Sequence, residues 1–349
     1  MKFADLIAGR ENNLNLIRLM AASAVALSHS YSFTGQVPSE PLLAWTGSLT
    51  FGYLSVFIFF VISGLLVAQS YERTQSIVGF IAARALRLYP ALIVVLVICA
   101  YFLGPLFTTL SLNDYLSNHE VRRYVQDNIL FKQRGGLPGV FSLDGGFTAT
   151  VNGSIWSLRY EVYAYLLLLS CGISGLISKR PLFNAFVALS LLLYAKEPLG
   201  TLLIPVDWSA VIYVPIMGFV VGMLIYVNRA QIDCKISYAI IALILYIWLK
   251  NHQWVHLIFA VTIGYVTLTL GLHQWLQLHI SLPNDYSYGI YLYAFPVQQV
   301  ITRTMSVQSP MLLFVSTMLL TVPLAMISWH AVEKPALRLK RFFMPVPRR

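Results

Sequence analysis

Charged residues are scarce in this 349-residue sequence, since Asp, Glu, Lys and Arg together make up 11% of it. A soluble domain carries roughly 25% charged residues. Hydrophobic residues make up 58%, and the mean hydropathy is +0.70. Apolar runs follow one another with little polar sequence between them, which excludes separate soluble domains with polar surfaces of their own. The sequence therefore predicts one all-α domain over 1–349, a polytopic transmembrane helical bundle.

Cysteine is almost absent, and so are several motifs of soluble enzymes. The three cysteines are Cys99, Cys171 and Cys234, and none has the C-x-x-C spacing of a redox or zinc site. No G-x-S-x-G is present, so a nucleophile elbow is not expected, and no histidine precedes an Asp by five positions. His252 and His256 have a metal-like spacing but no adjacent acidic ligand, so we expect no metal.

Long apolar runs are plentiful. A spanning helix needs about 20 mainly apolar residues, and we predict about ten spans. The candidates are Leu14–Phe33, Leu49–Ser70, Tyr89–Thr109, Ser154–Ile177, Pro181–Tyr194, Ser209–Tyr226, Ile236–Leu249, Val255–Leu272, Tyr286–Ile301 and Met311–Val332. Arg18 interrupts the first run and no cleavage site follows it, so this run is interpreted as a retained helix rather than a signal peptide. Gly218 and Gly222 form a G-x-x-x-G, which predicts close helix packing.

The net charge of +10 is explained by membrane topology better than by nucleic-acid binding. With ten spans and a cytoplasmic N-terminus, fifteen Lys and Arg residues fall inside and seven outside. This bias predicts that both termini are cytoplasmic, because positive residues accumulate on that side. The longest polar stretch, 110–153, then becomes an extracytoplasmic loop, and 333–349 becomes a basic cytoplasmic tail.

Arg18 and His29 lie on the first predicted span, 11 positions apart. At about 100° per residue this separation amounts to three turns plus roughly 20°, so both side chains face the same way. A buried arginine in a span marks a functional site by default. The alternatives are an Arg18 that snorkels to the inner headgroups and an interfacial His29, and the shared face makes both less probable together.

Arg84 and Arg87 form an R-x-x-R just before the third predicted span. Residues three apart share a helix face, and two guanidinium groups there suit bidentate contacts with phosphate. The alternative is a positive-inside anchor, which the spacing alone does not exclude.

The segment Trp156–Glu161 opens the fourth predicted span. Ser157 and Glu161 are four apart and share a helix face. The topology places Glu161 about two turns from the outer surface, at a depth similar to that of His29. A carboxylate in lipid needs a partner, which is either His29, with the acid orienting a base, or Arg159.

Taken in order, six segments resemble the acyltransferase-3 family over residues 15–335. They are Asn15-Leu16-Ile17-Arg18 with His29, Phe59–Leu66, Arg84-x-x-Arg87 with Tyr89-Pro90, Trp156-Ser157-Leu158 with Glu161, Ser287–Leu292 with Pro296, and Glu333-Lys334-Pro335. Asn15 stands where the family often has Asp, and Ala294 where many members have His. The chain is expected to be a stand-alone form without the SGNH domain that many members carry.

This resemblance implies transfer of an acyl group, usually acetyl, from cytoplasmic acyl-coenzyme A to a saccharide beyond a bacterial cytoplasmic membrane. Acceptors in the family include lipopolysaccharide, exopolysaccharide, peptidoglycan and glycolipids. The site expected from the residues and the resemblance comprises His29 and Glu161 for catalysis, Arg18, Arg84 and Arg87 for the donor, and Trp156, Ser157, Tyr288 and Tyr291 as supporting residues. Whether His29 is a general base or a covalent acyl carrier stays open.

Two other functions fit parts of the pattern. A transporter or flippase of a lipid-linked sugar would also use a path lined by Arg, His and Glu, but it would need no acyl donor and leave no ester. A structural partner in a polysaccharide assembly complex would need neither Arg18 nor His29 nor Glu161. Nucleic acid is not expected as a partner, and the oligomeric state stays open.

Overall fold

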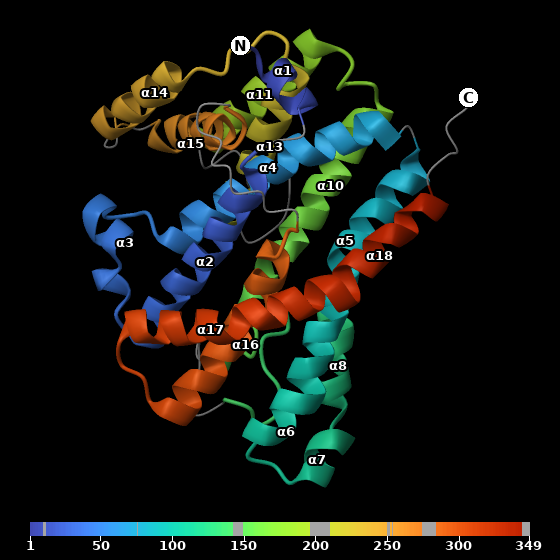
Figure 1. The fold of residues 1–349 in the computed structure, drawn as a ribbon, viewed down its shortest axis with the longest axis vertical. Helices are drawn as coiled ribbons and strands as arrows, with labels where there is room; N and C mark the ends of the chain where they lie inside the picture. The colour runs from blue at the N-terminus through green and yellow to red at the C-terminus, as the bar shows by residue number, and fades with distance from the viewer. Residues whose placement is uncertain are drawn as a thin grey trace. The chain divides into compact units, whose positions relative to one another are not determined.

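The computed structural model describes residues 1–9, 12–74, 76–141, 149–195, 210–249, 252, 254–273 and 284–343. Within these ranges the regular structure is helical (Figure 1). The β-pairing among the described residues consists of two isolated bridges, Lys2 with Asp233 and Thr108 with Val140. The predicted all-α class is therefore confirmed for the described part of the chain.

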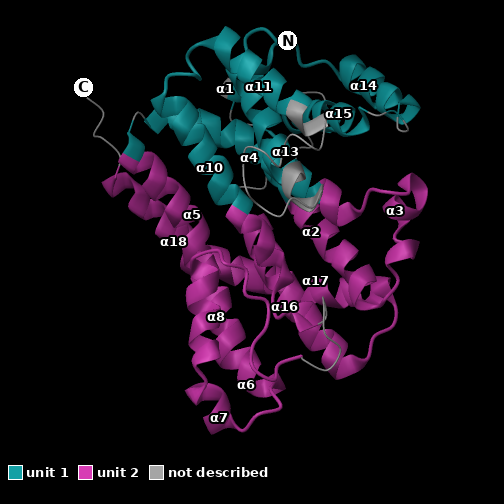
Figure 2. Cartoon of the chain, turned by 180° about the vertical axis from the view of Figure 1, so that it is seen from behind, with its two compact units in different colours: residues 1–18, 55–77, 160–283 teal, residues 19–54, 78–159, 284–349 magenta. Residues whose placement is uncertain are grey.

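The chain folds as two compact units that alternate along the sequence (Figure 2). Unit 1 comprises residues 1–18, 55–77 and 160–283, and unit 2 comprises 19–54, 78–159 and 284–349. The boundaries fall inside helices α2 (Leu14–Phe33), α4 (Phe51–Thr74) and α10 (Leu158–Ile173), and after Ile77, the first residue of α5 (Ile77–Ile98).

Each predicted span contains a helix. Besides α2 and α4, these are α5 (Ile77–Ile98), α10 (Leu158–Ile173), α11 (Arg180–Ala195), α13 (Ala210–Val227), α14 (Ile236–Trp248), α15 (Val255–Leu272), α16 (Ser287–Met305) and α17 (Pro310–Ser328). Two predicted starts were wrong. Helix α5 begins at Ile77 rather than Tyr89 and continues through Pro90, and α10 begins at Leu158, after the 3₁₀ turn η3 (Gly153–Ser157), rather than at Ser154.

Among the described residues, four helical segments are long and apolar enough to cross a membrane by length and composition: Phe51–Thr74, Ile77–Phe107, Val255–Leu272 and Pro310–Phe342. Three shorter apolar helices accompany them, at Arg180–Leu192, Pro215–Val227 and Ile236–Trp248. This is the make-up of a multi-pass membrane protein. The count of ten spans and the sides of the two termini stay predictions.

In unit 1, helices α4 and α13 approach through glycines. A Cβ on Gly222 would come within 2.1 Å of the Val61 carbonyl oxygen, and one on Gly64 within 2.1 Å of the Phe219 carbonyl oxygen. Only glycine allows backbones this close, so the predicted packing role of Gly218 and Gly222 is confirmed. The N-terminal residues join the same unit through an ion pair of 2.9 Å between Lys2 Nζ and Asp233. The hydrogen bond from Lys2 lowers the pKa of Asp233 below its ordinary value.

In unit 2, α16 and α17 pack side by side (Figures 1 and 2). A buried apolar cluster joins α2 to both of them through Phe33, Phe295, Ile301 and Leu313. Gln298 of α16 adds a polar link, donating hydrogen bonds to the Ala26 carbonyl oxygen at 2.7 Å and to Ser30 Oγ at 2.8 Å. The C-terminal half of α2, which carries His29, is thereby fixed against α16.

The stretch predicted as an extracytoplasmic loop contains two helices, α7 (Leu112–Ser117) and α8 (His119–Ile129). They pack on a π-helical turn, η2 (Cys99–Leu103), and on α6 (Gly104–Phe107), which continue α5. A π-turn leaves a carbonyl group without its usual helical partner, and the Tyr115 hydroxyl donates to the Ala100 carbonyl oxygen there at 2.8 Å. The side of the membrane on which this stretch lies stays a prediction.

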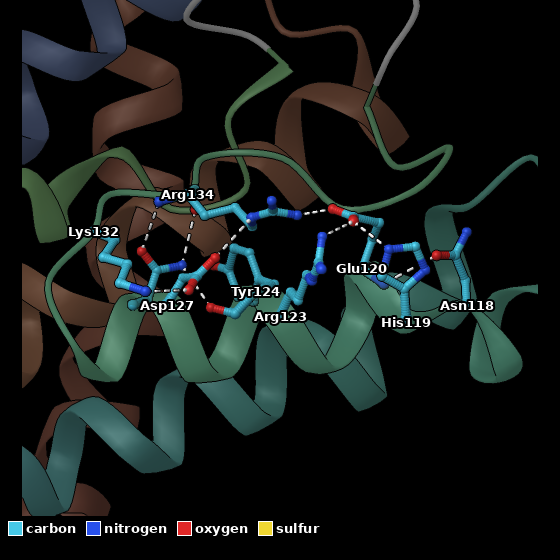
Figure 3. A network of polar contacts seen from close by, with 9 residues as sticks. Asn118, His119, Glu120, Arg123, Tyr124, Asp127, Lys132 and Arg134 are labelled. Carbon is cyan, nitrogen blue, oxygen red and sulfur yellow. Dashed lines mark hydrogen bonds and ion pairs between the residues drawn. The ribbon is translucent and has the colours of Figure 1, made fainter.

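A charged network holds the chain after α8 against that helix (Figure 3). Glu120 forms ion pairs with Arg134 and Arg123 and lies 2.8 Å from His119 Nε2. Asp127 pairs with Lys132 and with Arg134, both at 3.3 Å. Arg134 therefore bridges two carboxylates that lie about two turns apart on the same face of α8, and this fixes the path of residues 130–134.

Candidate functional site

His29 is half-buried on α2 and is placed by α16. Its ring contacts Phe295 edge-on, with ring centroids 5.2 Å apart. Phe295 is fully buried and also packs on Phe33 and against the backbone of Gly153. Gln298, one turn further along α16, donates hydrogen bonds to the turn of α2 that carries His29. Unit 2 thus brings together three parts of the sequence, at α2, η3 and α16, around Phe295, whose ring contacts this histidine.

A pair of buried hydroxyl groups lies on the same elements. Ser157 Oγ, at the end of η3, and the Tyr291 hydroxyl, on α16, share a hydrogen bond of 2.7 Å. Asn152 caps η3 by accepting from the Ser154 amide at 3.1 Å, and it donates to the Leu292 carbonyl oxygen at 3.0 Å. Two of the predicted supporting residues, Ser157 and Tyr291, are therefore in direct contact.

The segment Trp156–Arg159 is held by the turn that follows α8. Gln133 Nε2 donates to the Trp156 carbonyl oxygen at 2.7 Å, and Arg159 Nε donates to the Phe131 carbonyl oxygen at 2.6 Å. Phe131 and Gln133 adopt φ values of 56° and 57°, which are uncommon for non-glycine residues. Such strain persists where the surroundings impose it, and here the charged network of α8 and the two hydrogen bonds supply that constraint.

Arg87 has a different setting from the one its motif suggests. Its guanidinium group pairs with Asp285 at 2.6 Å and with Glu333 at 3.4 Å. It also lies 5.3 Å from the centroid of the Tyr288 ring and 5.9 Å from that of Trp329. Two carboxylates already neutralise it, so a phosphate group would have to displace one of them. The geometry gives Arg87 the role of a clamp between α5, α16 and the π-turn η6 (Trp329–Glu333).

Tyr288 belongs to the same clamp, because its hydroxyl donates to the Leu88 carbonyl oxygen at 2.8 Å. Ser328 donates to Glu333 at 3.1 Å, and Asp285 accepts from the Ser287 amide at 3.2 Å. Glu333 is 2% exposed and Asp285 is 9% exposed, so both carboxylates depend on these partners. Glu333 of the final E-K-P motif is therefore a buried ion-pair partner of Arg87 in the R-x-x-R motif.

The remaining predicted residues are placed as follows. Arg84 lies on α5 in unit 2 and is half-buried. Arg18 lies in unit 1, with its guanidinium carbon 5.9 Å from the centroid of the Phe59 ring. Glu161 also lies in unit 1, where it accepts a hydrogen bond from Tyr165. His29 and Glu161 belong to different units, and their pairing stays a prediction.

Several residues that shape this region escaped the sequence analysis. Glu40 is 1% exposed and accepts from Ser28 Oγ, next to His29, at 3.0 Å and from the Phe51 amide at the start of α4. Asp285 and Gln298 are likewise buried acceptors or donors whose partners are far away in sequence. The available signal was a polar residue beside an apolar run, which is too common to single them out. Among the described residues, no three His, Cys, Asp or Glu side chains gather as metal ligands would.

Among the described residues, four long apolar helices are typical of a membrane protein, and a half-buried histidine packs against α16. Comparison with known proteins assigns the family. The model of the family described as "Acyltransferase domain", of the acyltransferase-3 type, matches residues 11–330. The chain belongs to this acyltransferase family.

Curated relatives are similar over most of their length. An "O-acetyl transferase" of Shigella phage Sf6 is 28% identical over 333 residues, covering 93% of this chain and 96% of the relative. "Nodulation protein 10" of Rhizobium leguminosarum bv. viciae is 27% identical, covering 95% of each chain. "Protein 2 in picA locus" of Rhizobium radiobacter is 27% identical over 53% of this chain. No solved structure matches the chain.

Proposed function

We propose that this protein transfers an acetyl group from acyl-coenzyme A on the cytoplasmic side to a hydroxyl group of a surface or lipid-linked saccharide on the far side of a bacterial cytoplasmic membrane. The observation that carries this proposal is the similarity to the phage O-acetyl transferase, which extends over nearly the whole of both chains. The arrangement of His29, Ser157 and Tyr291 in unit 2 supports it.

His29 is proposed to act on the acceptor. As a general base, an imidazole nitrogen of His29 takes the proton of the sugar hydroxyl while the hydroxyl oxygen attacks the thioester carbonyl carbon. The carbon–sulfur bond then breaks, and the departing coenzyme A thiolate takes up that proton. As an acyl carrier, His29 would attack the thioester first and pass the acyl group to the sugar in a second step. Both routes end in an ester and a free thiol.

The supporting residues divide into two groups. Phe295 and Gln298 fix the turn of α2 that carries His29, and the Ser157–Tyr291 pair supplies hydroxyl groups on the same elements. Arg84 is proposed to contact donor phosphates, and Arg18 to contact the donor along α2. Arg87 holds α5 in place for Arg84 through its pairs with Asp285 and Glu333. The proposed role of Glu161 as the acid that supports His29 rests on its predicted depth in the membrane.

The test is mass spectrometry of surface glycans from cells with and without the gene. We expect ester-linked acetyl groups that disappear on deletion and return with the wild-type gene. Glycans without any ester in either strain, together with movement of a lipid-linked sugar by reconstituted protein in vesicles, would replace this proposal with the transporter function.

A further inference from the structure

A polar cavity of about 450 Å³ lies within unit 1, and none of the residues assigned a role above lines it. It is bounded by the end of α4, the end of α10 with the turn that follows it, the start of α11 and the end of α13. Ligand pockets typically measure about 300–1,000 Å³. Its lining includes Tyr71, Glu72, Gly172, Arg180, Tyr226 and Arg229.

Glu72 and Arg229 form an ion pair in the wall of the cavity. Arg229 Nη2 donates to both carboxylate oxygens of Glu72, at 2.9 and 3.0 Å, and the Tyr226 hydroxyl donates to the same carboxylate. The Arg229 guanidinium carbon also lies 4.1 Å from the centroid of the Tyr226 ring. Glu72 and Arg229 therefore neutralise each other and form a fixed wall.

Arg180 leaves a net positive charge. It is exposed at the start of α11, and one of its Nη atoms faces the side-chain amide oxygen of Gln231 in the orientation that satisfies that amide. In the part of the chain that the structure describes, no carboxylate lies within ion-pair distance of Arg180. A guanidinium group in a pocket without an acidic partner suits a phosphate group, which it contacts through two N–H donors.

Tyr71 gives the cavity a fixed aromatic wall. Its ring lies so close to Gly172 that a Cβ at that position would come within 2.2 Å of Tyr71 Cζ. Because Gly172 has no side chain, the ring packs directly against the backbone of α10. Nucleotide bases stack on such aromatic faces.

We propose that this cavity binds the 3′-phosphorylated adenosine end of coenzyme A, with Arg180 at the 3′-phosphate and Tyr71 beside the adenine. The inference rests on the proposed function, which makes an acyl-coenzyme A the donor. Sidedness supports it, because Arg180, Arg229 and the neighbouring Arg73 and Lys179 all belong to the residues predicted to face the cytoplasm. Arg87 already pairs with two carboxylates, so another basic residue is needed to bind a phosphate group of the donor.

The experiment compares two probes on the purified full-length protein in detergent. Isothermal titration gives the Kd of coenzyme A and of dephospho-coenzyme A, which lacks only the 3′-phosphate. We expect coenzyme A to bind the wild type about tenfold more tightly, a ratio typical of one lost charge-assisted contact. Arg180→Gln should bring this ratio to about one, and Arg180→Lys should leave an intermediate ratio.

The matched control is Lys179→Gln, which removes an exposed positive charge next to Arg180 from a residue that does not line the cavity. It should keep the wild-type ratio. Size-exclusion profiles and Tm values of all variants check that each is folded. Tyr71→Leu should weaken both probes equally, since both carry the adenine.

Three results would overturn the inference: equal affinity of the wild type for both probes, an unchanged ratio in Arg180→Gln, or displacement by short-chain phosphatidylglycerol with no response to the 3′-phosphate. The last would assign the cavity to a lipid headgroup. Acylation of glycans by a wild type that does not distinguish the probes would refute this inference alone. A retained ratio without any acylation would refute the proposed function and leave the nucleotide site standing.

Discussion

At the scale of single residues, the surroundings of His29 are built by distant parts of the chain. A general base contributes typically 10²–10⁴-fold to a rate. His29→Ala should therefore lower the ester-linked acetyl content of the glycan by about this factor, normalised to membrane-inserted protein. The fold should survive, because one half-buried side chain does not decide the packing of α2 against α16 while Gln298 and Phe33 remain.

The controls are His252→Ala and His256→Ala. Both side chains are exposed, so their removal should leave most of the activity. Near wild-type acylation by His29→Ala would remove the histidine from the mechanism. Equal losses in all three variants would point to a general effect on expression or insertion.

The Ser157–Tyr291 pair allows a second test at this scale. Tyr291→Phe leaves the buried Ser157 hydroxyl without its partner, which costs about 1–3 kcal/mol. Ser157→Ala should cost a similar amount, and the double variant little more than either single one, because the hydrogen bond is lost only once. Unfolding midpoints in detergent measure these costs. Additive losses would show that the two hydroxyl groups act independently.

At the scale of helices, Arg87 ties α5 to α16 and η6 through two buried carboxylates. Removing one partner of a buried pair typically costs about 3–5 kcal/mol, because the remaining charge is left uncompensated. Arg87→Ala should therefore lower the Tm strongly, and Glu333→Gln should lower it less, since the amide still accepts a hydrogen bond. Thermal unfolding of the purified variants checks both.

The neighbouring Arg84 makes the comparison decisive. Arg84→Lys should leave the Tm unchanged and raise the KM for acyl-coenzyme A roughly tenfold, if about 1.4 kcal/mol of uniform binding is lost. The opposite pattern, a stable Arg87→Ala variant with a raised donor KM, would return Arg87 to the phosphate site that its motif suggests.

The helices also show what local sequence can and cannot predict. The bounds of α2 and α15 were predicted at both ends, because long apolar runs stop there at polar residues. The start of α5 was missed, since Ile77–Leu88 carries two arginines and precedes Pro90, a usual boundary signal. Its helical state is supported by the Arg87 ion pairs with residues far along the chain.

The site divides in the same way. Its predicted residues, such as His29, Ser157 and Tyr291, stand in recognisable motifs. Their supports do not: Gln298 contacts α2 across a separation of 268–272 positions, and Asp285 contacts Arg87 across 198. No local periodicity encodes such pairs, because they arise only when distant helices pack.

At the scale of the whole molecule, the sides of the membrane can be tested with the cysteines. The three native cysteines are buried and free, so they should react slowly with a membrane-impermeant maleimide. Ser117→Cys at the end of α7 and Leu339→Cys in the tail introduce single exposed thiols. Neither substitution alters a charge, so neither changes the basic bias that predicts the topology.

In intact spheroplasts, Ser117→Cys should be labelled at once, whereas Leu339→Cys should be labelled only after permeabilisation. This follows from the fifteen-to-seven distribution of Lys and Arg, which one missed span would invert for every later loop. Labelling of both thiols in intact spheroplasts would place them on the same side of the membrane. The number of spans between residues 117 and 339 would then be even, whereas the prediction requires an odd number. The reverse pattern would place α7 and α8, with the charged network on α8, in the cytoplasm. His29 lies about one turn before the end of α2, which the predicted topology places on the outer side. The reversed orientation would therefore exchange the acceptor side of the proposed reaction with the donor side.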